Sequence, residues 1–197
     1  NLGLKKCKYN IVMRMDTDDV SVSDRFEKQI KYMEEHKDVS VVGGFLDEFI
    51  EDPEKIERTK TMPCSYENVK KYAKFRNPIN HMTVCFRKKD VLEVGNYQPL
   101  FYLGDYYLWA RVLVNNKKIE NIPYVLVHAR IGNGFEKRRG DKRYIKGWKK
   151  LQKYLYEHNF INSIQRIRNL IGMYTFVYVP SDIRIFFYNK ILRKKCK

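Results

Sequence analysis

The chain has 197 residues, enough for one folded domain with an appendage and a sizeable buried core. Aromatic residues make up 14% and charged residues 31%, a composition that excludes a disordered tail. The net charge of +16 is uneven: residues 137–197 hold 17 Lys and Arg against three acids, or 17 − 3 = +14, which leaves 16 − 14 = +2 for residues 1–136. A basic segment of this kind points to a polyanionic partner such as lipid headgroups, nucleic acid or an acidic substrate.

Apolar patterning predicts an α/β body followed by a helical, basic extension. We expect the body to occupy residues 1–135 and the extension residues 136–197. In chain order the predicted elements are a strand over 9–15, a helix after Ser23, a strand over 39–46, a helix after Ser65, a strand over 82–86, a short helix over 89–94, a helix over 106–114 and a strand over 119–127.

Three details of these elements can be checked against a structure. Phe26, Ile30 and Met33 fall at helical spacing and are predicted to face the core. The pair Gly43-Gly44 indicates a bulge or a close backbone approach within its strand. Pro123 is predicted to break the strand over 119–127.

The extension carries apolar residues at helical spacing among its Lys and Arg residues. Such basic amphipathic helices are typical of segments that lie on an anionic membrane. The alternative is that the apolar stripes pack on the body and the charges are merely solvated. Nucleic acid is not expected as a partner, because no recognised RNA or DNA motif accompanies the charge. The stripes consist of Tyr144, Trp148, Leu151 and Leu155, then Ile164, Ile167 and Ile171, then Ile183, Phe187 and Ile191.

The compartment is predicted from absences in the sequence. The four cysteines are widely scattered, without metal-ligand spacing or a disulfide framework, which favours a reducing compartment. The chain opens without a signal-peptide core. No apolar run reaches the roughly 18–20 residues of a spanning helix. We therefore expect a cytoplasmic protein, attached peripherally to the inner face of the membrane if the extension binds lipid.

The most informative segment is an acidic turn, Asp16-Thr-Asp-Asp19, directly after the first strand. Clustered carboxylates repel one another and require a compensating cation when they are partly buried. Mg²⁺ or Mn²⁺, with carboxylate and phosphate ligands, is the natural cation, and ligands sit at strand ends in α/β sheets. The alternative is a solvated turn before a helix.

Three metal-carboxylate motifs compete for this turn. An EF-hand loop fails because Val20 and Ser21 stand where an oxygen ligand and a glycine are needed. A haloacid-dehalogenase-like phosphatase, with Asp16 as nucleophile and Asp18 as acid, fits the D-x-D-x-V pattern. Its later Gly-Asp pair is present, but Trp109 stands where a further acid belongs. The third motif is the D-x-D turn of a nucleotide-sugar transferase.

The stretch Arg14–Gln29 resembles the R-M-D-x-D-D and D-R-x-x-x-Q segments of family 2 inverting glycosyltransferases. The resemblance implies a GT-A fold, a Rossmann-like α/β domain. It also implies that Asp16 and Asp18 bind the nucleotide-sugar donor, a UDP-sugar, through Mn²⁺ or Mg²⁺, with Asp19 as a further metal ligand. Arg14 is implied to be a positive group beside the donor, while Arg25 is expected to brace the turn.

The resemblance continues through Asn77–Lys88, Val91–Tyr97 and Gly104–Trp109, the last being similar to the family's E-D-x-x-L-W. It implies that Asp105 is the catalytic base that takes the proton of the acceptor hydroxyl during inverting transfer. A plain helix N-cap is the alternative for this residue. Gly104 departs from the family, which usually has Glu there, and this puts acceptor binding in doubt.

Four further residues are weaker candidates for contacts with the acceptor or the diphosphate. A structural role is the alternative for each, and a core position is the commoner one for a tryptophan in such a motif. They are His81, Trp109, His128 and Arg130.

The resemblance covers residues 1–132 and leaves out the first strands of such a domain, which bind the nucleotide base. We therefore expect an N-terminally truncated chain with little transferase activity by itself. The expected function is transfer of a hexosyl or related sugar, with inversion, to a hydroxyl of a glycan or lipid-linked acceptor in surface polysaccharide or glycolipid synthesis. The alternatives are the phosphatase and a non-catalytic basic protein that binds a membrane or a partner.

Overall fold

The computed structural model describes residues 1–132 and 142–178. In this part of the chain one mixed sheet lies at the centre, with strand order β1-β5-β3-β6-β2 and with β4 paired to β3. The strands are β1 (Ile11–Met13), β2 (Val20–Ser21), β3 (Val39–Phe49), β4 (Arg58–Lys60), β5 (Cys85–Arg87) and β6 (Lys118–Arg130). The helices are α1 (Leu2–Lys6), α2 (Arg25–Glu35), α3 (Tyr66–Tyr72), the 3-10 turn η1 (His81–Thr83), α4 (Lys88–Glu93), α5 (Gly104–Val114), α7 (Lys142–Glu157) and α8 (Ser163–Tyr178).

The long strands β3 and β6 pair in parallel, and the other strand pairs are antiparallel. The predicted break at Pro123 is wrong, because β6 runs unbroken from Lys118 to Arg130. The register instead shifts where Gly44 and Phe45 oppose Ile122 and Val125, so a bulge accommodates the proline.

Both glycines of the pair in β3 lie against neighbouring residues, as the sequence predicted. A Cβ on Gly43 would stand 2.5 Å from Ile79, and one on Gly44 would stand 2.6 Å from Leu126. Only a residue without a side chain fits at either position. The bulge and the close approach are therefore both confirmed.

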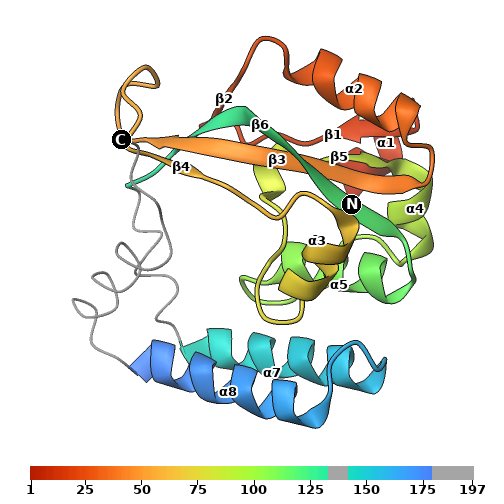
Figure 1. Ribbon diagram of the computed structural model, residues 1–197, viewed down its shortest axis with the longest axis vertical. Helices are drawn as coiled ribbons and strands as arrows, with labels where there is room; N and C mark the ends of the chain where they lie inside the picture. Colours follow the sequence, from red (N-terminus) through yellow and green to blue (C-terminus); the bar gives the residue numbers. More distant parts are fainter. Residues whose placement is uncertain (133–141, 179–197) are drawn as a thin grey trace.

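The helices lie on both sides of the sheet (Figure 1), with α2 on one face and α3 and α5 on the other. Successive residues of β3 point to opposite faces, so Val41 joins the core under α5 and Val42 joins the core under α2. The predicted α/β class is confirmed.

Helix α2 turns a polar face to the sheet, contrary to the prediction that Phe26 faces inward. Phe26 is 60% exposed, whereas Arg25, Gln29 and Met33 are buried. The spacing of apolar residues gave the wrong inner face for α2, because the polar side chains of Arg25 and Gln29 find hydrogen-bond partners in the core. Gln29 donates to the carbonyls of Val42 (3.2 Å) and Thr83 (2.8 Å), and it accepts from Arg25 Nε (2.9 Å).

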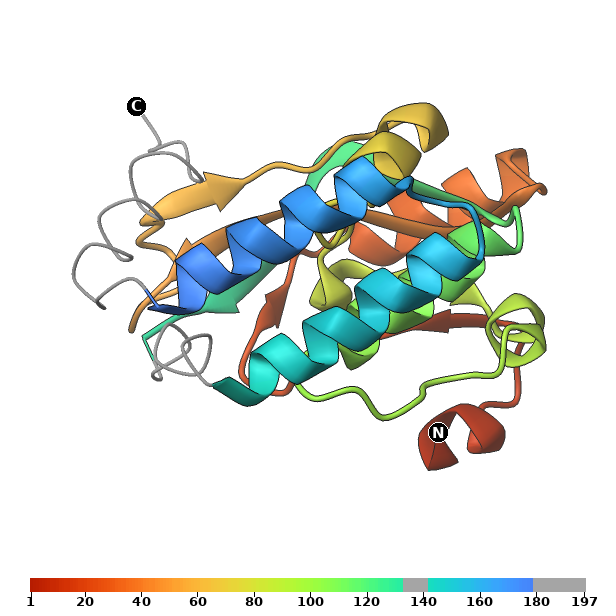
Figure 2. The same cartoon turned by 90° about the horizontal axis from the view of Figure 1, so that it is seen from below.

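Helices α7 and α8 form a further layer against α5, and Figure 2 shows the two side by side on this outer face. Trp148, Leu151 and Leu155 of α7 belong to the same hydrophobic core as Tyr106 and Trp109 of α5. The predicted helical extension is therefore present, and its first helix packs on the body. The stripe of Ile183, Phe187 and Ile191 lies outside the described residues.

Within residues 1–132 and 142–178, no helix combines the length and the apolar character needed to cross a membrane. Cys7, Cys64 and Cys85 are free thiols.

The buried amide of Gln29 gives a direct test of this packing. Gln29→Met keeps the approximate volume but leaves two buried carbonyls and Arg25 Nε without their partner. We expect the free energy of unfolding to fall by roughly 2–4 kcal/mol, measured by urea denaturation. Lys31→Met, on the exposed face of the same helix, should change it by no more than about 0.5 kcal/mol. Equal effects of the two substitutions would contradict a structural role for the buried amide.

Candidate active site

The acidic turn connects β1 with β2 and lies against the end of β6. Val20 of β2 pairs with His128 of β6, which brings the turn to the last residues of that strand. The backbone N–H of Arg130 donates to Asp19 Oδ1 at 2.9 Å. The turn is thus fixed to the sheet by its last acidic residue.

Arg14 and Arg25 hold the first part of the turn. The Arg14 guanidinium forms an ion pair with Asp16, on side chains that are 28% and 35% exposed. The buried Arg25 donates from Nη2 to the Arg14 carbonyl oxygen at 2.8 Å. The expectation that Arg25 braces the turn is confirmed.

Asp19 is the carboxylate of the turn that is most affected by its surroundings. The pKa of Asp19 is raised to about 6, mainly by burial and also by the nearby negative charges of Asp16 and Asp18, against the opposing effect of the Arg130 hydrogen bond. Within the described residues, Asp19 Oδ2 is buried and lacks a hydrogen-bond partner. A cation at this point would supply a partner and favour the charged form.

These carboxylates fit a metal ion that takes further ligands from a bound diphosphate. Asp18 is exposed, Asp16 is half-buried and Asp19 has one unpaired oxygen, so oxygen donors of the type preferred by Mg²⁺ and Mn²⁺ are present. Among the residues that the structure describes, no three His, Cys, Asp or Glu side chains already converge as a metal cage. The protein alone therefore offers an open set of ligands.

A second cluster surrounds Asp105 at the beginning of α5. Asn77 donates from Nδ2 to Asp105 Oδ2 at 2.8 Å. No other hydrogen bond within 1–132 and 142–178 engages this carboxylate, so Oδ1 is left for another donor. The position in the first turn of a helix also favours a negative charge.

His81, in η1, completes this cluster through Tyr97. His81 Nε2 and the Tyr97 hydroxyl are 2.9 Å apart, and Trp109 packs edge-on against the His81 ring with centroids at 5.9 Å. Burial lowers the pKa of His81 to about 4, opposed by the negative charge of Asp105. Asp16 and Arg14 also act on this pKa, so His81 lies within electrostatic reach of both the acidic turn and Asp105.

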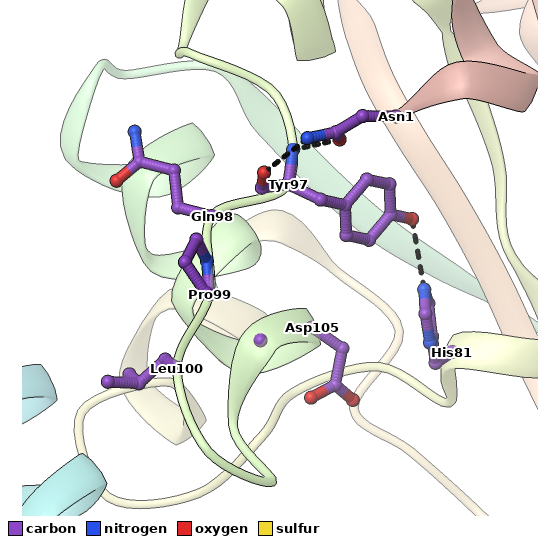
Figure 3. A pocket seen from close by; sticks show the side chains of 8 residues that line it. Asn1, His81, Tyr97, Gln98, Pro99, Leu100 and Asp105 are labelled. Atoms are coloured by element: carbon purple, nitrogen blue, oxygen red, sulfur yellow. Dashed lines mark hydrogen bonds between the residues drawn. The ribbon is translucent and has the colours of Figure 1, made fainter.

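An open hollow of about 540 Å³ lies next to Asp105. Figure 3 shows Tyr97 extending toward His81, with the Asp105 carboxylate nearby at its helix start. A Cβ on Gly104 would meet only the Gln98 carbonyl, at 3.7 Å, so the missing side chain leaves real space at the rim. The lining residues are Asn1, His81, Tyr97, Gln98, Pro99, Leu100, Gly104 and Asp105.

The other weaker candidates lie in two places. Trp109 is 0% exposed, so its ring supports His81 from the core and offers no face to a ligand in this structure. His128 is bonded through Nδ1 to the Pro53 carbonyl at 3.0 Å. Arg130 donates to the carbonyls of Ile50 (3.0 Å) and Glu51 (3.1 Å). His128 and Arg130 both lie at the end of β6, beside the acidic turn.

The sequence did not single out Asn77 or Tyr97 as site residues. Both stand inside the stretches that carry the family resemblance, which was the available signal. Their roles depend on the fold, because Asn77 lies 28 residues from Asp105 in the chain. Nothing in local spacing shows that these side chains meet.

Solved structures share this architecture. S. aureus TarS 1–349 in complex with UDP-GlcNAc matches with a TM-score of 0.62 and 12% identity, over 97% of this chain and 55% of that one. The mannosyltransferase PcManGT from Pyrobaculum calidifontis matches with a TM-score of 0.54 and 10% identity, over 93% of this chain and 49% of that one. At such identities the likeness shows the fold alone, which is that of the GT-A glycosyltransferases.

Sequence relatives then identify the family. Residues 1–94 match the model for glycosyl transferase family 2. An uncharacterized glycosyltransferase from Haemophilus influenzae is 35% identical, covering 98% of this chain and 72% of its own length. An Escherichia coli UDP-Gal:alpha-D-GlcNAc-diphosphoundecaprenol beta-1,3-galactosyltransferase is 33% identical, covering 98% and 70%. The chain belongs to glycosyl transferase family 2, which decides against the phosphatase.

One relative is more similar over a shorter stretch. The amylovoran biosynthesis glycosyltransferase AmsE from Erwinia amylovora is 42% identical over 146 residues, 74% of this chain. The match spans 54% of that relative's length.

The partly buried His81 leads us to predict a pH dependence of stability. Its folded pKa of about 4 lies below the ordinary value of 6.5, so the unfolded chain binds more protons between these values. The stabilisation is fully present above pH 6.5 and is lost as the pH falls toward 4. We expect His81 to contribute a loss of up to about 3 kcal/mol over this range, read in urea unfolding as the difference between wild type and His81→Gln, because Asp19, with its pKa raised to about 6, contributes with the opposite sign in both proteins.

His81→Gln should remove that part of the loss, because glutamine does not titrate. The matched control is His158→Gln at an exposed site, which should keep the loss. The same pH profile in wild type and His81→Gln would contradict the burial of a neutral His81.

Proposed function

We propose that this chain carries the metal-binding and acceptor-binding parts of an inverting glycosyltransferase that uses a nucleotide-sugar, a UDP-sugar. The acceptor is a hydroxyl of a glycan or a lipid-linked sugar in surface polysaccharide synthesis. Family membership supports sugar transfer. The biosynthetic role in the name of AmsE, and the diphosphoundecaprenol-linked acceptor in the name of the galactosyltransferase, support a surface glycan as the product class.

The observation that carries the proposal is the setting of Asp105. Asn77 holds one carboxylate oxygen, and the carboxylate lines the open hollow beside Tyr97 and Gly104. A base for inverting transfer needs a fixed carboxylate with one oxygen accessible to the acceptor hydroxyl. Asp105 meets both requirements.

The reaction follows from that placement. The acceptor hydroxyl gives its proton to Asp105 while its oxygen forms a bond to the anomeric carbon. The bond from this carbon to the diphosphate oxygen breaks, and the electron pair leaves with the nucleoside diphosphate. Attack from the face opposite the leaving group inverts the anomeric configuration.

The acidic turn serves the donor. Asp16, Asp18 and Asp19 would hold the metal ion, which when bound neutralises the diphosphate charge as it develops. Arg14 keeps Asp16 in place through its ion pair and contributes positive charge on the donor side. Arg130, exposed at the end of β6, is a second cation on this side of the molecule.

The remaining site residues serve the acceptor. His81 and Tyr97 form a neutral pair on the wall of the hollow, and the space at Gly104 admits a larger acceptor than a glutamate would. The galactosyltransferase relative acts on a lipid-linked sugar by its name, which supports an acceptor of that class. Transfer to such an acceptor takes place at the cytoplasmic face of the membrane in this proposal.

The test replaces Asp105 by Asn, which keeps the shape but cannot take the proton. We expect kcat to fall by about 10²–10⁴-fold, with KM for the donor little changed. The assay follows UDP release from UDP-galactose and UDP-GlcNAc on a diphosphoundecaprenyl-linked acceptor, for this chain and for a form extended to the length of its relatives. Glu67→Gln, at an exposed acid of α3, is the matched control and should keep the wild-type rate.

Two results would contradict this account. The first is an Asp105→Asn variant that keeps its rate. The second is a product whose anomeric configuration, read by NMR, is that of the donor. Absence of turnover in both forms with either donor would favour the non-catalytic binding protein instead.

A further inference from the structure

Helix α8 presents an apolar stripe to solvent. Ile164 is 76% exposed, Ile167 57%, Ile171 61% and Tyr178 62%. Their spacing of three, four and seven residues places them along one side of the helix. Four large apolar side chains in a row on one helix are more than the scattered exposed residues of an ordinary surface.

The opposite side of α8 is fixed to α7 and to the body, so the stripe cannot turn inward. Asn169 is buried and donates to the Lys74 carbonyl (2.7 Å) and to Gln152 Oε1 (2.9 Å). Its carbonyl accepts from Trp148 Nε1 at 3.1 Å. Rolling the helix to bury the isoleucines would break all three hydrogen bonds.

The surroundings of the stripe are strongly basic. Residues 142–178 contain eight Lys and Arg and a single acid, Glu157, so the segment carries 8 − 1 = +7. Figure 2 shows α7 and α8 next to each other on this face. The exposed basic side chains of the two helices are Arg143, Lys146, Lys149, Lys150, Lys153 and Arg168.

We propose that this face lies on an anionic lipid surface, with Ile164, Ile167, Ile171 and Tyr178 in the acyl-headgroup boundary and the Lys and Arg residues on lipid phosphates. An interfacial helix needs this combination of an apolar side and basic flanks. The charge argues against a second copy, because two such faces would repel each other. This proposal assigns the face that meets the membrane. It rests on the proposed function only where it invokes a lipid-linked acceptor.

The same layer is joined to the acceptor hollow. The loop that lines the hollow packs on α7, where a Cβ on Gly147 would stand 3.0 Å from the Phe101 carbonyl. The Arg143 guanidinium lies 4.4 Å from the centroid of the Phe101 ring, which is itself partly exposed. A lipid-linked acceptor could thus enter the hollow while its lipid stays in the membrane.

The test is flotation of the whole chain with vesicles of phosphatidylcholine, with and without phosphatidylglycerol. We expect binding that rises with the phosphatidylglycerol fraction and falls at least tenfold in the triple variant Ile164→Gln, Ile167→Gln, Ile171→Gln. These sites are exposed, so the variant should fold normally, as circular dichroism will check. Phe26→Gln, equally exposed on α2 at the other side of the molecule, is the matched control and should bind as wild type.

A second readout reports insertion directly. Ile167→Trp should show a blue shift of its fluorescence on phosphatidylglycerol vesicles, above the constant signal of the buried Trp109 and Trp148. Phe26→Trp should show none. If the triple variant binds as wild type does, the contact is purely electrostatic and the proposal is overturned.

Absence of vesicle binding would also overturn it. If sedimentation then showed a wild-type dimer that the triple variant lacks, a second copy would be the occupant of the stripe. Vesicle binding requires neither donor nor acceptor, so its failure leaves the transferase proposal standing. Failure of the transferase assay leaves the lipid contact standing in the same way.

Discussion

The parallel pairing of β3 with β6 is the constraint on which the site depends. It runs from Val39 opposite Lys118 to Phe49 opposite Arg130, and it fixes where β6 ends. At that end the Arg130 N–H holds Asp19, so the acidic turn lies where the central strands finish. The pairing tolerates the bulge at Pro123 because Gly44 has no side chain. The following residues of β6 can therefore pack directly against its backbone. A shift of register here would move the turn and its carboxylates together.

Buried polar groups then join the sheet to the two halves of the site. Gln29 connects α2 to β3 and η1, and Arg25 extends the connection to the backbone of Arg14. The segment η1 carries His81, which is within electrostatic reach of both the acidic turn and Asp105. The acidic turn and η1 are therefore tied to one hydrogen-bonded network, while Asn77 holds Asp105 separately. Loss of its members should cost both stability and alignment.

The sequence predicted the strand that precedes the acidic turn, the helix that begins near Asp105 and the α/β class, because these depend on local patterns. It failed where tertiary partners decide. Phe26 seemed to be an inner residue by its spacing, but Arg25 and Gln29 face the core because their polar groups find partners there. The stripe of Ile164, Ile167 and Ile171 was equally visible as an amphipathic pattern. Its exposure could not be predicted, since it follows from Asn169 bonding to the body. The meeting of Asn77 with Asp105 was hidden for the same reason.

In our proposal the acidic turn binds a metal-bridged nucleotide diphosphate. Calorimetric titration of UDP, with and without Mn²⁺, tests it on this chain and on a form extended to the length of its relatives. We expect binding that requires Mn²⁺, is lost in Asp18→Ala and is kept in Asp24→Ala. Asp24 is an acid at the start of the neighbouring helix that pairs with Lys28. Binding that is indifferent to Mn²⁺ or to Asp18, or no binding by either form, would contradict it.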